Sequence, residues 1–319
     1  MRRLLLVLAV ALAAAGMVVA APKVKIAVSM PTADHGWMAG ANWWAQKAIS
    51  DWKAKDPDID FSLVTADTAQ KQASDIEDLL VKKINGIVVF PYDDSLTTVV
   101  EKAYKQGVYT VVLDRGTTKP VYDVWLRNDD QAYARQGMNW VASQLKGKGN
   151  VVLIEGIPSP INTIRVDTAK AVAGQYPGIK ILDSQPGNWN RQKALEVMQN
   201  YLQKYKQIDA VYTADDDMLL GALQAYKESG RKDIKVWLGG GGSKELVKKI
   251  IDNSDPLIKA DVTYPPDVVA TGVSLAVLGV RGRVFEGFYQ KKLPVNIILN
   301  SEFIDSKNAN DYYHPDAPF

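Results

Sequence analysis

Charged side chains follow two apolar runs of the sequence at the point where each run ends. Asp114 and Arg115 come directly after the run 111–113, and Asp215 follows the run 210–213. Carboxylates accept hydrogen bonds from hydroxyl groups and guanidinium groups donate to them, and each such charged bond contributes about 1.5–3 kcal/mol. These residue types therefore suit the recognition of a small molecule rich in hydroxyl groups.

Two tryptophans stand outside any apolar stripe. Trp37 lies in a stretch with Gly and Pro after an apolar run, which predicts a loop, and Trp189 lies among Gly, Asn and Arg. An indole face packs well on the apolar C–H face of a sugar ring, so both are candidates for stacking on a ligand. Five other tryptophans are expected to serve packing, on a helix or within strands: Trp43, Trp44, Trp52, Trp125 and Trp237.

Catalytic patterns are sparse. A hydrolase of the serine type needs a nucleophile beside a base, and no Ser stands in a Gly-x-Ser-x-Gly elbow after an apolar run. The two histidines are His35, beside Trp37, and His314, in a polar tail. Asp114 and Asp215 could face one another as a carboxylate pair, so a glycoside-processing enzyme stays open as the alternative function.

Two further motifs suggest a metal or a phosphate site at first sight. The triplet 215–217 lacks the alternating oxygen ligands of a calcium loop. The glycine run 239–242 lacks the Gly-Lys-Ser/Thr ending of a nucleotide-binding loop, and Ser243 is placed to cap a helix. No metal and no cofactor are therefore expected.

Apolar runs of strand length alternate with helical patterns along the chain, and the run 86–90 is the most continuous of them. Such alternation predicts βαβ units and parallel sheets buried on both faces. Two rounds of it, on either side of about residue 127, predict two doubly wound parallel-sheet α/β domains. The expected strands are 25–29, 61–64, 86–90, 109–113, 150–155, 179–182, 210–213 and 235–238. Ligands of such sheets bind at the carboxyl ends of the strands.

The first residues have the composition of an export signal. A short basic start at 1–3 precedes an apolar run over 4–19 and small residues before Ala21. A membrane anchor is the other interpretation of such a run, since a span needs about 20 apolar residues. We expect a signal peptide over 1–20 and a soluble mature protein in the periplasm, because the 319-residue chain has no cysteine to carry a lipid.

Composition excludes further classes. The formal net charge of +2 falls to zero without the two arginines of the leader, and no basic stripe follows, so nucleic acid is not an expected partner. The absence of cysteine also excludes a disulfide framework.

The order of several stretches resembles the periplasmic sugar-binding proteins of ABC transporters, in the ribose- and galactose-binding group. The most specific stretches are 183–200 and 210–223, and the pair Asp114-Arg115 is the next strongest. The resemblance implies the type I periplasmic binding protein fold, with two lobes joined by a three-segment hinge and a ligand between them. The lobes implied are 22–127 plus 264–297 and 128–263 plus 298–319.

The resemblance also implies a set of ligand contacts. Trp37 and Trp189 would stack on the two faces of the sugar. Asp114 and Arg115 would bind hydroxyl groups from the first lobe. Two residues would do so from the second lobe: Asn162 and Arg165.

Five positions depart from the family pattern. Asp215 stands where an Asn is usual, and Gly241 where an Asp is usual. Asp34-His35 replaces the amides usual before the first aromatic residue, and Thr263 sits where a Gln is common. The hydroxyl pattern that is recognised should therefore differ from that of ribose.

The resemblance implies a non-enzymatic receptor that binds a monosaccharide or cyclic polyol (a pentose, a hexose or inositol) and delivers it to a membrane permease. We expect a monomer that closes by hinge motion. A transcriptional regulator of the same architecture would need an amino-terminal helix-turn-helix where this chain has its leader. A cationic amine is a poorer ligand than a sugar, since Arg115 and Arg165 would repel it.

Overall fold

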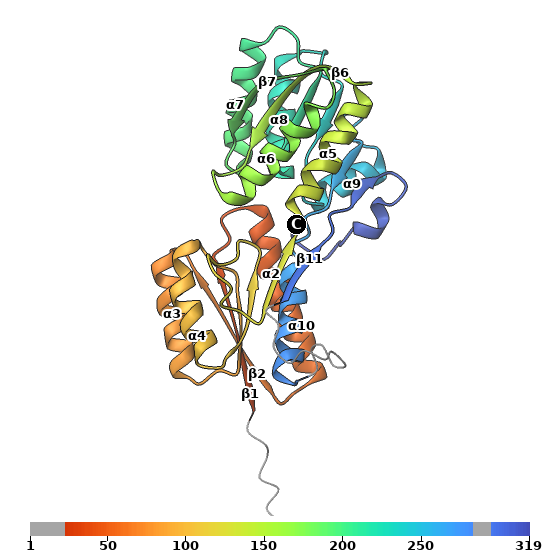
Figure 1. Ribbon diagram of the computed structural model, residues 1–319. Helices are drawn as coiled ribbons and strands as arrows, with labels where there is room; N and C mark the ends of the chain where they lie inside the picture. Colours follow the sequence, from red (N-terminus) through yellow and green to blue (C-terminus); the bar gives the residue numbers. More distant parts are fainter. Residues whose placement is uncertain (1–22, 283–294) are drawn as a thin grey trace, which may run out of the picture.

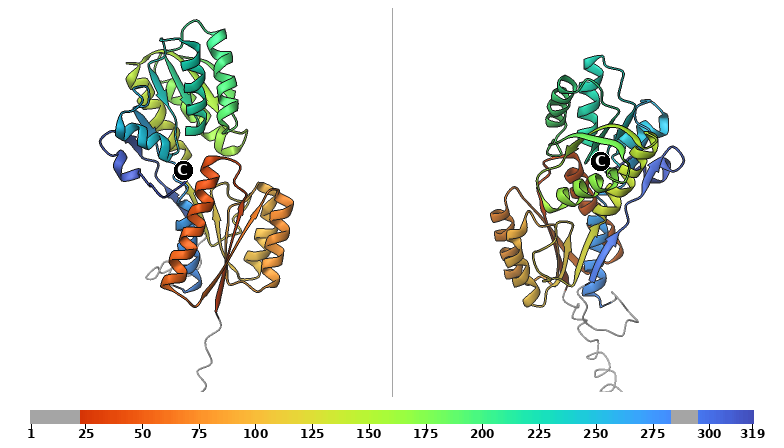
Figure 2. Two further views of the ribbon diagram at one scale, coloured as in Figure 1. Left: turned by 180° about the vertical axis from the view of Figure 1, so that it is seen from behind. Right: turned by 45° about the horizontal axis from the view of Figure 1, so that its top comes forward.

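The computed structural model describes residues 23–282 and 295–319, so the predicted signal peptide over 1–20 lies outside the described residues. Two α/β units lie end to end, one built on a six-stranded sheet and one on a four-stranded sheet (Figure 1). Each unit has helices on both faces of its sheet, and the same arrangement is visible from behind and with the top of the molecule tilted forward (Figure 2).

The sheet of the first unit is parallel throughout, in the order β11-β5-β4-β3-β1-β2. Its strands are β1 (Val24–Pro31), β2 (Ile59–Ala66), β3 (Gly86–Val89), β4 (Tyr109–Leu113), β5 (Val124–Asn128) and β11 (Val295–Leu299). One face is covered by α2 (Gly36–Lys55) and α10 (Val268–Val280). The other face is covered by α3 (Ala69–Val81) and by α4 (Thr97–Lys105), which the 3₁₀ turn η1 (Asp94–Leu96) precedes.

Continuous apolar runs form these strands because both faces of the sheet are buried. Successive side chains of a strand point to opposite faces. Ile26 and Val28 of β1 accordingly pack beneath α2 and α10, whereas Ala27 between them packs beneath α3 and α4.

The second unit repeats this plan with four parallel strands in the order β7-β6-β8-β9. They are β6 (Lys148–Glu155), β7 (Gly178–Pro186), β8 (Ala210–Thr213) and β9 (Val236–Leu238). α5 (Asp130–Gln144) and α6 (Pro160–Ala173) cover one face. The other face is covered by α7 (Arg191–Lys204), α8 (Asp216–Ser229) and α9 (Lys244–Asp252).

A small antiparallel pair completes the second unit. It joins β10 (Ala260–Val262) to β12 (Phe303–Asp305), and the 3₁₀ turn η2 (Ala309–Tyr312) packs beside α9. The chain passes between the units after β5, before α10 and after β11. The predicted class of two doubly wound parallel-sheet domains with a three-segment hinge is thereby confirmed.

Strand order changes direction at one point in each sheet, between β1 and β3 and between β6 and β8. Loops that leave neighbouring strands on either side of such a point diverge to opposite faces and open a crevice at the carboxyl ends. These carboxyl ends face one another across the junction of the two units (Figure 1).

Within the described stretches 23–282 and 295–319, no helix combines the length and apolar character needed to cross a bilayer.

Helix ends confirm one local expectation, the capping role of Ser243, and correct another, the loop expected around Trp37. Ser243 caps α9 by accepting from the Leu246 N–H, and α8 ends at Gly230 in the left-handed region. Trp37, however, lies in the first turn of α2 and not in a loop. Asp215 caps the amino end of α8, since its Oδ1 accepts the Met218 N–H at 2.7 Å.

Candidate ligand-binding site

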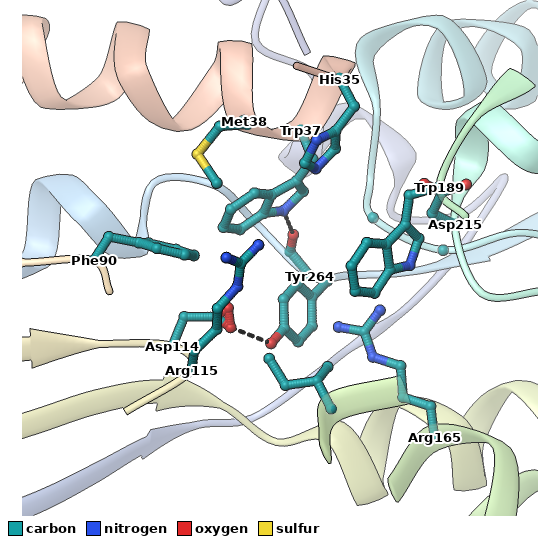
Figure 3. Close-up of a pocket in the computed structure, with 13 residues that line it drawn as sticks. His35, Trp37, Met38, Phe90, Asp114, Arg115, Arg165, Trp189, Asp215 and Tyr264 are labelled. Atoms are coloured by element: carbon teal, nitrogen blue, oxygen red, sulfur yellow. Dashed lines mark hydrogen bonds between the residues drawn. The ribbon is translucent and has the colours of Figure 1, made fainter. Parts of the chain in front are cut away.

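A cavity lies at the junction of the two units, with a volume of about 490 Å³ including the part open to solvent. Figure 3 shows its wall, to which both units contribute. The lining residues come from the segments that follow β1, β3, β4, β6, β7, β8, β9 and β10: His35, Trp37, Met38, Phe90, Asp114, Arg115, Ile161, Arg165, Trp189, Asp215, Gly240, Gly241 and Tyr264. All of these segments leave the carboxyl ends of strands, as the fold class predicts.

An aromatic corner closes one side of the cavity. The Trp37 indole N–H donates to the Tyr264 carbonyl oxygen at 2.6 Å, and the two ring centroids are 5.9 Å apart. Phe90, just beyond β3, lies 5.9 Å from the Trp37 ring on its other side. Because Tyr264 follows β10 where the chain crosses between the units, this bond ties α2 to the crossing segment.

Asp114 turns its carboxyl into the cavity from the end of β4. Its backbone is in the left-handed region, with φ of 51°, and its Oδ1 accepts from the Tyr264 hydroxyl at 3.0 Å. Burial, aided by Asp130, raises the pKa of Asp114 to about 6, while Arg115, Arg165 and Tyr264 oppose the rise. The carboxyl is thus mainly ionised at neutral pH and able to accept hydrogen bonds.

Arg115 stands beside Asp114 with its guanidinium over the Phe90 ring, 5.4 Å from the centroid. It also donates to the carbonyl oxygen of Tyr92. One end of the guanidinium is thereby fixed and the remainder faces the cavity (Figure 3).

Arg165 makes more contacts within the protein than the other charged residues of the cavity wall. It lies on α6 with 5% of its surface exposed, and its Nε donates to Asp130 Oδ1 at 2.7 Å. Its Nη1 donates to the Ala214 carbonyl oxygen at 3.2 Å. The guanidinium also lies 4.0 Å from the Tyr264 ring and 4.4 Å from the Tyr133 ring. Arg165 is therefore held by both α5 and the β8 end before any ligand binds.

Trp189 faces the cavity from the second unit. Its own backbone and that of Asn188 are left-handed, with φ of 53° and 58°, in the turn between β7 and α7. The indole stacks on His35 of the first unit, with ring centroids 6.3 Å apart and an interplanar angle of 22°. A methyl group on Gly156 would lie 2.3 Å from the indole, so a glycine there makes room for it.

Asp215 contributes a carboxyl from the amino end of α8. Burial and the neighbouring Asp217 and Asp216 raise the pKa of Asp215 to about 8, against the Met218 N–H and Arg165. Near neutral pH the carboxyl is therefore largely protonated.

Among the described residues there is no group of three or more histidine, aspartate or glutamate side chains able to hold a metal.

Eight of the eleven residues expected at the site line the cavity, and three do not. Asp34 is exposed and bonds to His35 Nδ1. Asn162 is buried on α6, and its Oδ1 accepts the Gly156 N–H at 2.7 Å. The Thr263 hydroxyl accepts the N–H of Glu302 at 2.7 Å, and Glu302 belongs to the segment between β11 and β12.

Five lining residues were not expected: Met38, Phe90, Ile161, Gly240 and Tyr264. Tyr264 is the most consequential, because it contacts Trp37, Asp114 and Arg165. It directly follows Thr263, and adjacent residues of an extended segment face opposite ways. The cavity contact expected from Thr263 is therefore made by the next residue, Tyr264.

The combined chemistry is that of a binding site for a small polyhydroxylated molecule. The cavity offers indole and phenol faces, two guanidinium groups, one ionised carboxyl and one carboxyl that is protonated. The sequence profile of the periplasmic binding protein domain matches residues 26–282. The chain belongs to the periplasmic binding protein family.

Relatives within the periplasmic binding protein family have names that specify sugars or polyols. The xylitol-binding protein of Mycolicibacterium smegmatis is 34% identical over 168 residues, which is 52% of this chain and 48% of that protein. The ribose import binding protein of Escherichia coli is 27% identical over 301 residues, 92% of this chain and 96% of that protein. The chain thus matches about half the length of the first relative and nearly all of the second.

Solved structures of periplasmic binding proteins share the fold. A solute-binding protein of an ABC transporter from Bacillus halodurans C-125, with bound myo-inositol, superposes with a TM-score of 0.79. The superposition covers 92% of this chain and 99% of that protein at 18% sequence identity. At that identity the likeness establishes the fold alone.

Proposed function

We propose that the chain is the solute receptor of an ABC importer and binds one monosaccharide or cyclic polyol in the cavity between its lobes. The observation that carries the proposal is the cavity wall itself. Stacking surfaces from Trp37 and Trp189 lie together with hydrogen-bonding groups from Asp114, Arg115 and Asp215. An enclosed ring with several hydroxyl groups uses all of these groups together.

The expected affinity is moderate. A few charge-assisted hydrogen bonds and two stacked faces, less the loss of ligand and side-chain freedom, correspond to a dissociation constant of about 1 μM, or about −8 kcal/mol. Lining residues from both units surround the cavity, which suits a single ring better than an oligosaccharide, since the latter would need a more open groove.

The remaining parts of the function follow from the family. We propose export through a cleaved signal peptide, a monomeric mature protein, and delivery of the ligand to a membrane permease without chemical change. The lobes in this proposal are 22–127 plus 264–297 and 128–263 plus 298–319, and ligand contacts from both favour the closed arrangement. The relatives are named as binding proteins, so the glycoside-processing alternative gains no support from them.

A thermal-shift screen of the mature protein tests the proposal, with pentoses, hexoses, inositols and pentitols as the panel and calorimetry on each hit. A ligand that binds the native state raises the melting temperature by mass action. We expect a clear rise for one compound or a few related ones, and chromatography should recover each unchanged. A flat response across the panel, or turnover of a glycoside, contradicts the proposal.

A further inference from the structure

The glycine run 239–242 borders the cavity with bare backbone. Gly240 and Gly241 line the wall, and a methyl group on Gly240 would lie 1.7 Å from the Tyr133 hydroxyl oxygen. The Gly241 N–H donates to the Val262 carbonyl oxygen at 2.8 Å. Because a run without side chains has a large backbone entropy to lose, its shape must be held by other parts of the chain.

Two carboxyl groups behind the run hold it. Asp216, in the first turn of α8, accepts the Gly240 N–H at 2.8 Å on one oxygen and the Ser243 N–H at 2.7 Å on the other. Asp261, in the middle of β10, accepts the Gly242 N–H at 3.1 Å on one oxygen and the Val262 N–H at 2.8 Å on the other. Backbone N–H groups at both ends of the run are therefore anchored on side chains from two separate elements.

The two carboxyl groups are buried together. Asp216 is 1% exposed and Asp261 is not exposed, and their bonds to Gly240 and Gly242, two residues apart, bring the two carboxyls within interacting reach of each other. In the described part of the chain, neither forms an ion pair with a lysine or arginine. Two adjacent carboxylates without a cation repel each other in a buried site, whereas one shared proton removes the repulsion and supplies the hydrogen of a bond between them.

The proton belongs on Asp261. Three donors reach Asp216, namely the Ser243 hydroxyl, the Ser243 N–H and the Gly240 N–H, whereas Asp261 accepts from two backbone N–H groups. Such donors stabilise an ionised carboxylate, so Asp216 is the better place for the charge. Burial raises the pKa of both groups, and the nearby charge of Asp216 raises the pKa of Asp261 further, well above its usual value.

We propose that Asp216 and Asp261 are positioning residues that share one proton, carried by Asp261, and so fix the cavity-facing shape of the glycine run. The pair thereby sets ligand affinity without touching the ligand. The part of this inference that concerns affinity rests on the proposed function, and the part that concerns the shared proton does not.

Other titratable groups face the pair. Tyr133 of α5 interacts electrostatically with both carboxyls, and burial raises its pKa well above the usual value. Asp215 and Asp217 flank Asp216 on α8, and Arg165 of α6 interacts with Asp215. Asp215 is the one of these with a pKa of about 8, so its titration must be removed when the pair is tested at alkaline pH.

Two amide variants separate the roles of the carboxyls. In Asp261→Asn the amide replaces the shared proton by a permanent donor to Asp216, but it gives up one of the two backbone N–H bonds that Asp261 accepts from Gly242 and Val262. We therefore expect the affinity for the ligand found in the screen to fall by less than about tenfold at pH 7. In Asp216→Asn an NH₂ group must face a backbone N–H, and we expect a loss of about tenfold or more. Asp261→Ala, which removes the donor, should show a similar loss.

The ranking of the variants decides the inference. A folded Asp261→Asn beside an Asp216→Asn that is weaker or fails to fold supports it. Equal losses in the two amide variants, the reverse order, or no loss in either overturns it.

A second measurement needs no ligand. In the Asp215→Asn background, the melting temperature should still fall between pH 7 and pH 9.5, because ionising Asp261 is disfavoured in the folded state and permitted in the unfolded chain. Adding Asp261→Asn should abolish that fall, and a fall that persists contradicts the shared proton. If the ligand screen gives no hit, the proposed function fails, and this profile alone decides the role of the pair.

Discussion

Individual side chains of the cavity wall differ in how much freedom they keep. Arg165 is engaged by a carboxylate, a carbonyl oxygen and two aromatic rings, whereas Trp189 has its stacking partner His35 on the opposite lobe. A residue that is held by its own lobe supports the fold as well as the ligand. Trp189 also packs at the edge of its own lobe's core, but it has no buried charge to leave unpaired and its stacking partner lies across the cavity, so it gives the cleaner test of binding.

Trp189→Ala should weaken ligand binding while leaving the lobes folded. We expect about a 10- to 100-fold rise in the dissociation constant, because one stacking face is lost. Calorimetry with the ligand identified in the screen measures it. Trp43→Ala is the matched control, since Trp43 contacts Trp44 on α2 and does not line the cavity. Equal affinity of Trp189→Ala and the parent would contradict the stacking role.

Asp215 makes the stability of the free protein depend on pH. Its pKa is raised from 3.8 to about 8, so the folded state holds a proton that the unfolded chain releases above pH 4. The stabilising contribution is complete below pH 4 and is lost as the pH rises through about 8. Melting temperatures from pH 6 to pH 9.5 should therefore fall less steeply in Asp215→Asn than in the parent. An identical slope would show that the carboxyl is ionised at neutral pH.

Elements of the second lobe are tied together by the buried pair of Arg165 on α6 and Asp130 on α5. Removing one member of such a pair leaves an uncompensated charge in the interior, which costs more than the pair itself contributes. Loss of binding in an Arg165 variant would therefore mix a missing ligand contact with a weakened helix contact.

Arg165→Ala should lower the free energy of unfolding by about 3–5 kcal/mol, because Asp130 is left buried without a partner. Arg165→Met combined with Asp130→Leu should restore most of that stability, since both charges are then absent. Urea unfolding followed by circular dichroism gives the comparison. The double variant is expected to bind no ligand even when it is as stable as the parent. A double variant no more stable than Arg165→Ala would argue against the charge explanation.

Element order was predictable from the sequence because strands buried on both faces leave continuous apolar runs. The amino end of α2 was not predictable, because its cap position is occupied by His35, which is not one of the usual capping residues and makes no capping bond. Tyr264 and Phe90 were missed for a related reason. Phe90 continues the apolar run of β3, and Tyr264 continues the extended segment after β10. Which of their neighbours faces the cavity depends on the three-dimensional register, which the sequence does not show.

The whole molecule joins its two lobes through three crossings and a few contacts across the junction. His35 stacks on Trp189, and the Phe319 ring lies between α2 and the glycine run. A methyl group on Gly40 would lie 2.8 Å from Phe319 Cβ, and one on Gly241 would lie 3.0 Å from its Cζ. Glycines on both lobes thus make room for one aromatic ring, which is half-buried between them.

Phe319→Ala should therefore loosen the closed arrangement without weakening either lobe. The ring offers apolar area to both lobes only in the closed state, so we expect ligand release to become about three- to tenfold faster. Stopped-flow tryptophan fluorescence measures the release rate, and circular dichroism checks that the melting temperature of the free protein is kept. Tyr313→Ala is the control, because Tyr313 belongs to the same tail but packs against the core of the second lobe beside Lys248. Faster release in both variants would assign the effect to the tail as a whole, whereas faster release in Phe319→Ala alone would assign it to the ring between the lobes.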